Sequence, residues 1–189
     1  MRQFITLLAI VMFSVGTFAQ TSWKVDAAHS SLNFSIKHSG ISLVNGKFTD
    51  YTGDMTTNGP DLETAKFDFN VKVTSINTNV EPRDNHLRSA DFFEVEKYPN
   101  MTFKSTKIMK KGKENQYLLF GDLTIKGVTK PVVFDLWHSG TAKSDKGEKM
   151  GFKAKTTINR FDYNINYDPG AAGIGKDVEI LVHLQMAKQ

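Results

Sequence analysis

The side chains best suited to ligand binding or proton transfer are gathered in one short segment. Arg83, Asp84 and His86 stand within four residues of each other, and Arg88 follows two residues later. An arginine fork matches the oxygens of a phosphate or carboxylate, and a histidine donates or accepts a proton near neutral pH. We therefore take Arg83, His86 and Arg88 as candidates for contact with the polar head group of a ligand.

A structural role for the same segment stays open. Asp84 is of a residue type that caps helices, so Arg83 and Asp84 could instead hold a short helix through hydrogen bonds to the backbone. His38, which ends an apolar stretch, could contact a head group or a backbone carbonyl. Residue types alone do not separate head-group binding from helix anchoring.

Two other charged pairs have expected structural roles. Asp26 and His29 are three residues apart near the start of the mature chain, where we expect their side chains to pair across a turn. Arg160 and Asp162 flank a phenylalanine between two strand-like segments. We expect them to form a buried ion pair that ties the last strands together, and contact of this segment with a ligand stays open as the less favoured alternative.

The chain lacks the motifs of common catalytic and metal sites. It has no cysteine, so thiol catalysis and thiolate metal sites are excluded, and it has no G-x-S-x-G segment. A metal site needs three or four converging ligands, and its histidines show neither H-x-H nor H-E-x-x-H spacing. We predict no catalytic residue, no metal ion and no cofactor. The histidines are His29, His38, His86, His138 and His183.

Strands must position these residues, because apolar and polar side chains alternate through most of the chain. This period-2 pattern, with turn motifs between segments, is typical of antiparallel sheets with one buried face. We predict an all-β protein of roughly eight strands that curls into a barrel or pairs as two sheets. The predicted inward residues are Phe34, Ile36, His38, Phe67, Phe69, Val71, Met101, Phe103, Leu123, Val132, Phe134, Leu136, Phe152, Ile180 and Val182.

The interior of such a barrel has two interpretations. Eight strands enclose a space that side chains either fill completely or leave open for one ligand. The segment from 83 to 93 interrupts the alternation with a charged, helix-prone sequence. We predict a short helical insert near residues 83–93, which could cover one end of the barrel.

The beginning of the chain predicts export. Arg2 precedes an apolar run from Phe4 to Val15, and small residues at Thr17 and Ala19 fit signal peptidase cleavage. The alternative is an uncleaved anchor, but the run is short for a span of ~20 residues. We expect a signal peptide at 1–19, one domain at 20–189, no membrane span after cleavage, and a periplasmic or secreted protein. The missing cysteine excludes a lipoprotein, and the mild net charge of +4 argues against nucleic acid as a partner.

Many short motifs in this order resemble the YceI-like family, the secreted polyisoprenoid-binding proteins with a lipocalin-like barrel. The resemblance covers nearly all of the mature chain. The matching segments are Trp23–Asp26, His29–Ser30, Phe34–His38, Gly46–Phe48, Ser75–Thr78, Arg83–Leu87, Asp91–Phe93, Tyr98–Pro99, Phe103, Gly121–Pro131, Arg160–Asp162 and Ile174–Leu184.

The resemblance implies an extended eight-stranded antiparallel barrel, often dimeric. It also implies that the lumen holds a long-chain isoprenoid or similar amphiphile, such as a polyprenyl phosphate or an isoprenoid quinone. An apolar tunnel discriminates weakly among chains of similar width, so fatty acids or fatty amides stay as alternative ligands. Two other hypotheses also stay open: a filled barrel that acts through protein partners, and an enzyme that acts on an isoprenoid head group.

Overall fold

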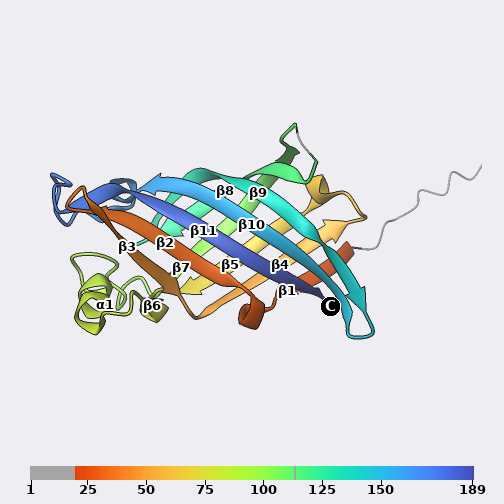
Figure 1. The fold of residues 1–189 in the computed structure, drawn as a ribbon, viewed down its shortest axis with the longest axis horizontal. Helices are drawn as coiled ribbons and strands as arrows, with labels where there is room; N and C mark the ends of the chain where they lie inside the picture. Colours follow the sequence, from red (N-terminus) through yellow and green to blue (C-terminus); the bar gives the residue numbers. More distant parts are fainter. Residues whose placement is uncertain (1–19, 113) are drawn as a thin grey trace, which may run out of the picture.

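The computed structural model describes residues 20–112 and 114–189, which form one antiparallel sheet that closes on itself (Figure 1). The predicted signal peptide lies outside these residues. The strands are β1 (Gln20–Val25), β2 (Ser31–His38), β3 (Ser42–Phe48), β4 (Tyr51–Asn58), β5 (Lys66–Lys72), β6 (Ile76–Asn77), β7 (Asn100–Lys110), β8 (Gln116–Ile125), β9 (Val128–Ser144), β10 (Gly147–Asn159) and β11 (Ile174–Lys188). The helical elements are α1 (Glu81–Arg88) and the 3₁₀ turns η1 (Ala27–His29), η2 (Leu62–Thr64), η3 (Val73–Ser75) and η4 (Arg160–Tyr163).

Eight strands close the ring, in the order β1-β4-β5-β7-β8-β9-β10-β11, and β11 pairs back to β1. All of these pairings are antiparallel, which confirms the predicted barrel. Closure removes the exposed strand edges that would otherwise promote aggregation. In a closed ring, each strand also forms backbone hydrogen bonds with neighbours on both sides, which helps to hold together a domain that has no disulfides.

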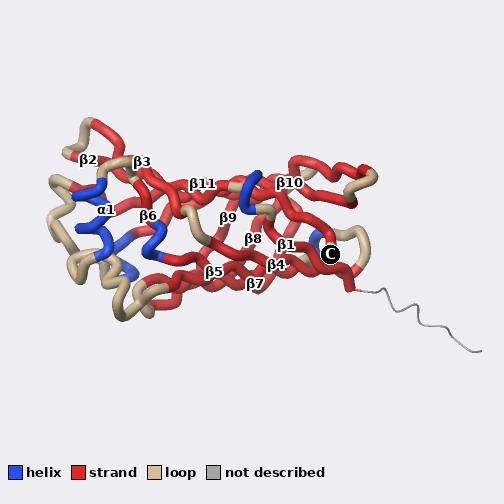
Figure 2. The backbone as a smooth tube through the Cα atoms, turned by 90° about the horizontal axis from the view of Figure 1, so that it is seen from below, coloured by secondary structure: helices blue, strands red, loops and turns tan. Residues whose placement is uncertain are grey.

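The remaining strands extend the wall toward one end. The last residues of β11, around Met186, pair with β1, whereas Val178–His183 pair with β2. Strands β1 and β2 therefore pair with successive parts of the same strand, β11. Strand β3 pairs with β2, and β6 pairs with β3. Helix α1 comes directly after β6 and lies at this end of the barrel, far from β1 and the C-terminus (Figures 1 and 2). The predicted short helical insert near residues 83–93 is thus confirmed, although the helix starts two residues earlier and ends five residues earlier, at Arg88.

Asp84 anchors α1 but does not cap it. The N-cap position is Val80, with Pro82 in the first turn, where its missing N–H is harmless. Asp84 is buried inside the helix, and its carboxylate accepts hydrogen bonds from the backbone N–H and hydroxyl of Thr78. Arg88 adds bonds to two further backbone carbonyls, those of Thr74 and Ile76, each 2.9 Å long. These bonds favour the alternative in which the segment anchors the helix, although Asp84 is not the cap residue.

Asp26 lies between β1 and β2, and its side chain links this turn to neighbouring strands. Its carboxylate lies 2.9 Å from His29 Nδ1 and accepts hydrogen bonds from Gln185 Nε2 and Lys149 Nζ. The expected Asp26–His29 pair is confirmed. Burial works against the charge, but these hydrogen bonds prevail and lower the pKa of Asp26 to about 2.

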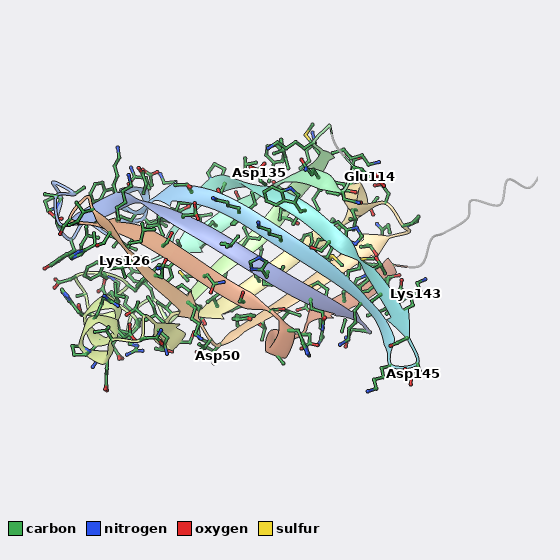
Figure 3. The ribbon with its side chains drawn as sticks, viewed as in Figure 1. Asp50, Glu114, Lys126, Asp135, Lys143 and Asp145 are labelled. Atoms are coloured by element: carbon green, nitrogen blue, oxygen red, sulfur yellow. The ribbon has the colours of Figure 1, made fainter. Side chains whose placement is uncertain are left out.

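The barrel is packed solid at the end that carries β1 and the C-terminus. Large side chains from several strands meet there, and Trp23, Met55, Phe152 and Met186 are each no more than 2% exposed. We call this group of four the plug. Charged side chains such as Asp50, Lys143 and Asp145 are exposed at the outer surface and loops (Figure 3). Within residues 20–112 and 114–189, no helix has the length and apolarity to cross a bilayer.

Candidate functional site: an apolar cavity

A cavity of about 580 Å³ occupies the half of the barrel beyond the plug. Its wall is almost entirely aliphatic and aromatic, and it runs from Leu136 and Leu184 beside the plug to Pro82 and His86 on α1. Pro82, His86 and Tyr167 line the cavity and are also exposed, so the cavity reaches solvent at the α1 end. The cavity thus has a closed end and an open mouth.

All of the predicted inward residues except Val132 and Phe152 line this cavity. Val132 is partly buried and packs against the core, and Phe152 belongs to the plug. The alternation of apolar and polar residues therefore identified which side chains point inward. It did not show where along the barrel the packed plug ends and the cavity begins. The residues that do line it are Phe34, Ile36, His38, Phe67, Phe69, Val71, Met101, Phe103, Leu123, Phe134, Leu136, Ile180 and Val182.

Of the three head-group candidates, Arg83 and His86 line the cavity and Arg88 does not. Arg83 lines the cavity, and its guanidinium donates to the hydroxyl of Thr78 at 2.8 Å and to the carbonyl of Thr78 at 3.0 Å. His86 also lines the cavity. Arg88 is absent from the lining, because its guanidinium is turned toward the backbone of η3 and β6. Arg88 is thus placed as an anchor of α1 rather than as a contact to the cavity.

An aromatic cluster of three residues stands at the mouth. The ring of His86 lies edge-on to Phe92 and to Tyr167, with centroids 5.0 Å away in both cases. Its Nε2 lies 2.9 Å from Asp91 Oδ2. Because Tyr167 belongs to the loop before β11, this cluster joins α1 to the opposite rim of the mouth. His38 lies on the rim as well, exposed, with its Nδ1 3.4 Å from the Ser39 hydroxyl.

Arg160 is a cavity residue whose setting differs from the expected ion pair. It is only 3% exposed, and its guanidinium donates to the carbonyls of Ile165, Asp168, Ile174 and Gly175. In the described part of the chain, no carboxylate oxygen lies within 4.0 Å of it, so the expected pair with Asp162 is wrong. Burial lowers the pKa of Arg160, and the negative charge of Asp168 acts in the opposite direction.

Tyr163 was also missed by the analysis of alternation. It lines the cavity, it is 1% exposed, and burial raises its pKa to about 12. Its hydroxyl has no hydrogen-bond partner among the residues described. Tyr163 lies at the end of a 3₁₀ turn, where the two-residue period of a strand does not apply. The available signal was a polar residue pair three positions apart immediately after a strand.

Further wall residues also come from irregular segments. Leu87, Phe93 and Ile165 line the cavity from α1 and from loops, and Phe48 contacts Phe93 edge-on at a centroid distance of 6.1 Å. As regards metal chemistry, residues 20–112 and 114–189 contain no group of three or more histidine, aspartate or glutamate side chains that could hold an ion. The arrangement is thus suited to enclosing an elongated apolar molecule with a few polar contacts at its mouth.

A model of the YceI-like domain matches residues 23–186. The chain belongs to the YceI-like family. Protein YceI of Escherichia coli O157:H7 is 36% identical to this YceI-like protein over 184 residues, which cover 96% of this chain and 94% of that one. The resemblance drawn from the motifs is therefore confirmed.

Solved structures confirm the barrel fold of this YceI-like chain. A YCEI protein of Campylobacter jejuni superposes with a TM-score of 0.73 at 35% identity, covering 81% of this chain and 89% of that chain. A polyisoprenoid binding domain from Saccharophagus degradans superposes with a TM-score of 0.69 at 17% identity, covering 88% and 98%. The second likeness, at this low identity, shows the fold alone.

Proposed function

We propose that this protein binds a long-chain isoprenoid, such as a polyprenyl phosphate or an isoprenoid quinone, without changing it chemically. The observation that carries the proposal is the apolar cavity of about 580 Å³, closed by the plug and open beside α1. The volume lies within the range of known ligand sites, roughly 300–1,000 Å³. The fold shared with a polyisoprenoid binding domain supports the same ligand class.

The chemistry of the wall favours a hydrocarbon tail as the buried part. Removing apolar surface from water contributes about 25 cal/mol per Å², so a long chain lying among Phe34, Phe69 and Phe103 would bind tightly without any charge contact. Such binding is insensitive to salt, unlike binding through exposed ion pairs. The polar groups at the mouth, including Arg83 and His86, are available to the head group.

A fatty acid or fatty amide would bury its tail by the same mechanism and is the second ligand class for the test. The cavity disfavours a filled barrel that acts only through protein partners. We further propose that residues 1–19 direct export and that the barrel works in the periplasm or outside the cell, because the sequence there has the composition of a signal peptide.

Native mass spectrometry of the protein purified from its export pathway tests this proposal, followed by organic extraction of whatever is bound. We expect a stoichiometric isoprenoid that leaves on extraction and rebinds to the delipidated protein. A stoichiometric fatty acid would replace the isoprenoid with the second ligand class. A clean unliganded mass that isoprenoid quinones, polyprenyl phosphates and fatty acids all leave unchanged would overturn the proposal.

A further inference from the structure

The hydroxyl of Tyr163 is the polar atom of the barrel interior that lacks an explanation. Among residues 20–112 and 114–189, no other buried side-chain nitrogen or oxygen is without a hydrogen-bond partner. A buried hydroxyl left unpaired destabilises the folded state, because water satisfied it in the unfolded chain. The ring of Tyr163 lines the cavity, so a cavity ligand could supply the missing partner.

Arg160 adds a second observation beside it. Residues three apart in a 3₁₀ turn lie on the same side of the turn, and Arg160 and Tyr163 both line the cavity. The carboxylate of Asp168 interacts with Arg160 through its charge without forming an ion pair, and it accepts hydrogen bonds from the backbone N–H groups of Gly173 and Ile174. One turn of the apolar wall therefore contributes both a positive charge and an unpaired hydroxyl.

Resting on the proposed function, we propose that Tyr163 and Arg160 form a polar subsite for a hydrogen-bond-accepting oxygen of the bound lipid. The Tyr163 hydroxyl donates to that oxygen, and the Arg160 charge stabilises its partial or full negative charge. A quinone carbonyl and a phosphate oxygen share this chemistry. Since Tyr163 packs with Phe92 and Ile165 near the mouth, the head group lies there and the tail points to the plug.

The competing explanation is purely structural, because Arg160 holds two carbonyls of the loop before β11 and two at the start of β11. For that reason Arg160 variants are poor probes, since they could disrupt the loop. Tyr163→Phe is a better one. It keeps the ring that packs in the wall and removes only an unpaired hydroxyl, so we expect its thermal midpoint to equal or exceed that of the wild type.

The experiment titrates delipidated protein with three probes that carry the same prenyl chain: a benzoquinone, a phosphate and an oxygen-free hydrocarbon. We expect Tyr163→Phe to weaken the quinone, the phosphate or both by about tenfold, equivalent to 1.4 kcal/mol, and to leave hydrocarbon affinity unchanged. A loss on one oxygenated probe alone would support the subsite and identify the head group. Tyr117→Phe is the matched control, since Tyr117 is 8% exposed in the core and does not line the cavity.

Two outcomes would overturn the subsite. One is an unchanged affinity for both oxygenated probes, and the other is an equal loss on all three, which would indicate altered packing. If the wild type still bound the hydrocarbon in those cases, the cavity proposal would stand and only the subsite would fail. If the wild type bound none of the three probes, the proposed function would fail and the subsite with it.

Discussion

Phe69 lies directly over Gly53, its partner across the β4–β5 ladder. A Cβ atom at Gly53 would come within 2.2 Å of Cε1 of Phe69, a distance that real Cβ atoms do not adopt. The same pairing recurs at Gly46, where a Cβ atom would lie 2.3 Å from the ring of its partner Phe34. At Gly121 a Cβ atom would lie 2.5 Å from the ring of Phe103, which is on the neighbouring strand but pairs with Leu123. Each glycine lets a cavity ring lie flat against the wall instead of crossing the lumen.

Replacing Gly53 by alanine should therefore narrow the cavity. The new methyl displaces the Phe69 ring toward the lumen, and we expect a loss of about 1–3 kcal/mol in the free energy of unfolding together with weaker lipid binding. Urea denaturation and lipid titration measure the two effects. Gly170→Ala is the control, because nothing lies within 4 Å of a Cβ there. Unchanged stability and affinity in Gly53→Ala would show that the ring contact is unimportant.

Filling the cavity from its wall should block ligand uptake. Val71 and Val182 both line the cavity, so Val71→Trp and Val182→Trp place an indole where the lipid tail would lie. We expect each variant to lose most of the bound lipid in native mass spectra. Val133→Trp is the matched control, because Val133 points outward on β9 and is 42% exposed. Folded tryptophan variants that bind lipid like the wild type would refute the assignment of the cavity as the binding site.

Alternation predicted the fold well, because one buried face per strand is a direct consequence of barrel closure. It also predicted the inner face, as the lining by Phe69 and Phe103 illustrates. It could not distinguish Phe152, which has the same parity but stands in the plug, since parity carries no information on position along the barrel axis. Tyr163 escaped it because the 3₁₀ turn in which it lies follows no two-residue period.

The charged side chains of α1 show a different limit of prediction from sequence. Sequence types suggested a binding role for Arg83, His86 and Arg88 together, whereas the structure sends Arg88 to the backbone of Thr74 and Ile76. Arginine can donate hydrogen bonds to backbone carbonyls as well as to phosphates. Whether an arginine of α1 binds backbone carbonyls or faces the cavity depends on tertiary contacts with β6. Spacing along the chain does not encode these contacts.

Loosening α1 should open the mouth. Asp84→Asn weakens the pair of hydrogen bonds from Thr78, and we expect a loss of about 1–2 kcal/mol locally, with faster lipid dissociation. Hydrogen exchange of the α1 amides and lipid dissociation rates measure the effect. Glu81→Gln, an exposed change in the same helix, serves as control. Equal dissociation rates in both variants would mean that α1 does not restrict the mouth.

Asp26 should make stability depend on pH in the acid range. Its folded pKa of about 2 lies below the ordinary value of 3.8, so the carboxylate contributes stability above about pH 4, and this is lost as the pH falls toward 2. Allowing for partial exposure, we expect about 1 kcal/mol. Urea denaturation of wild type and Asp26→Asn across pH 2–7 should show a difference that shrinks as the solution is acidified. A constant difference would contradict this linkage.

In the part of the chain that the structure describes, the plug makes the barrel a container with a single aperture. A lipid cannot be threaded through it, so loading and unloading must occur at the same rim, and the end that goes in last comes out first. A donor and an acceptor would then compete for one docking position. A chain longer than the cavity would be held by its inner portion, leaving its surplus length projecting past α1 and Tyr167.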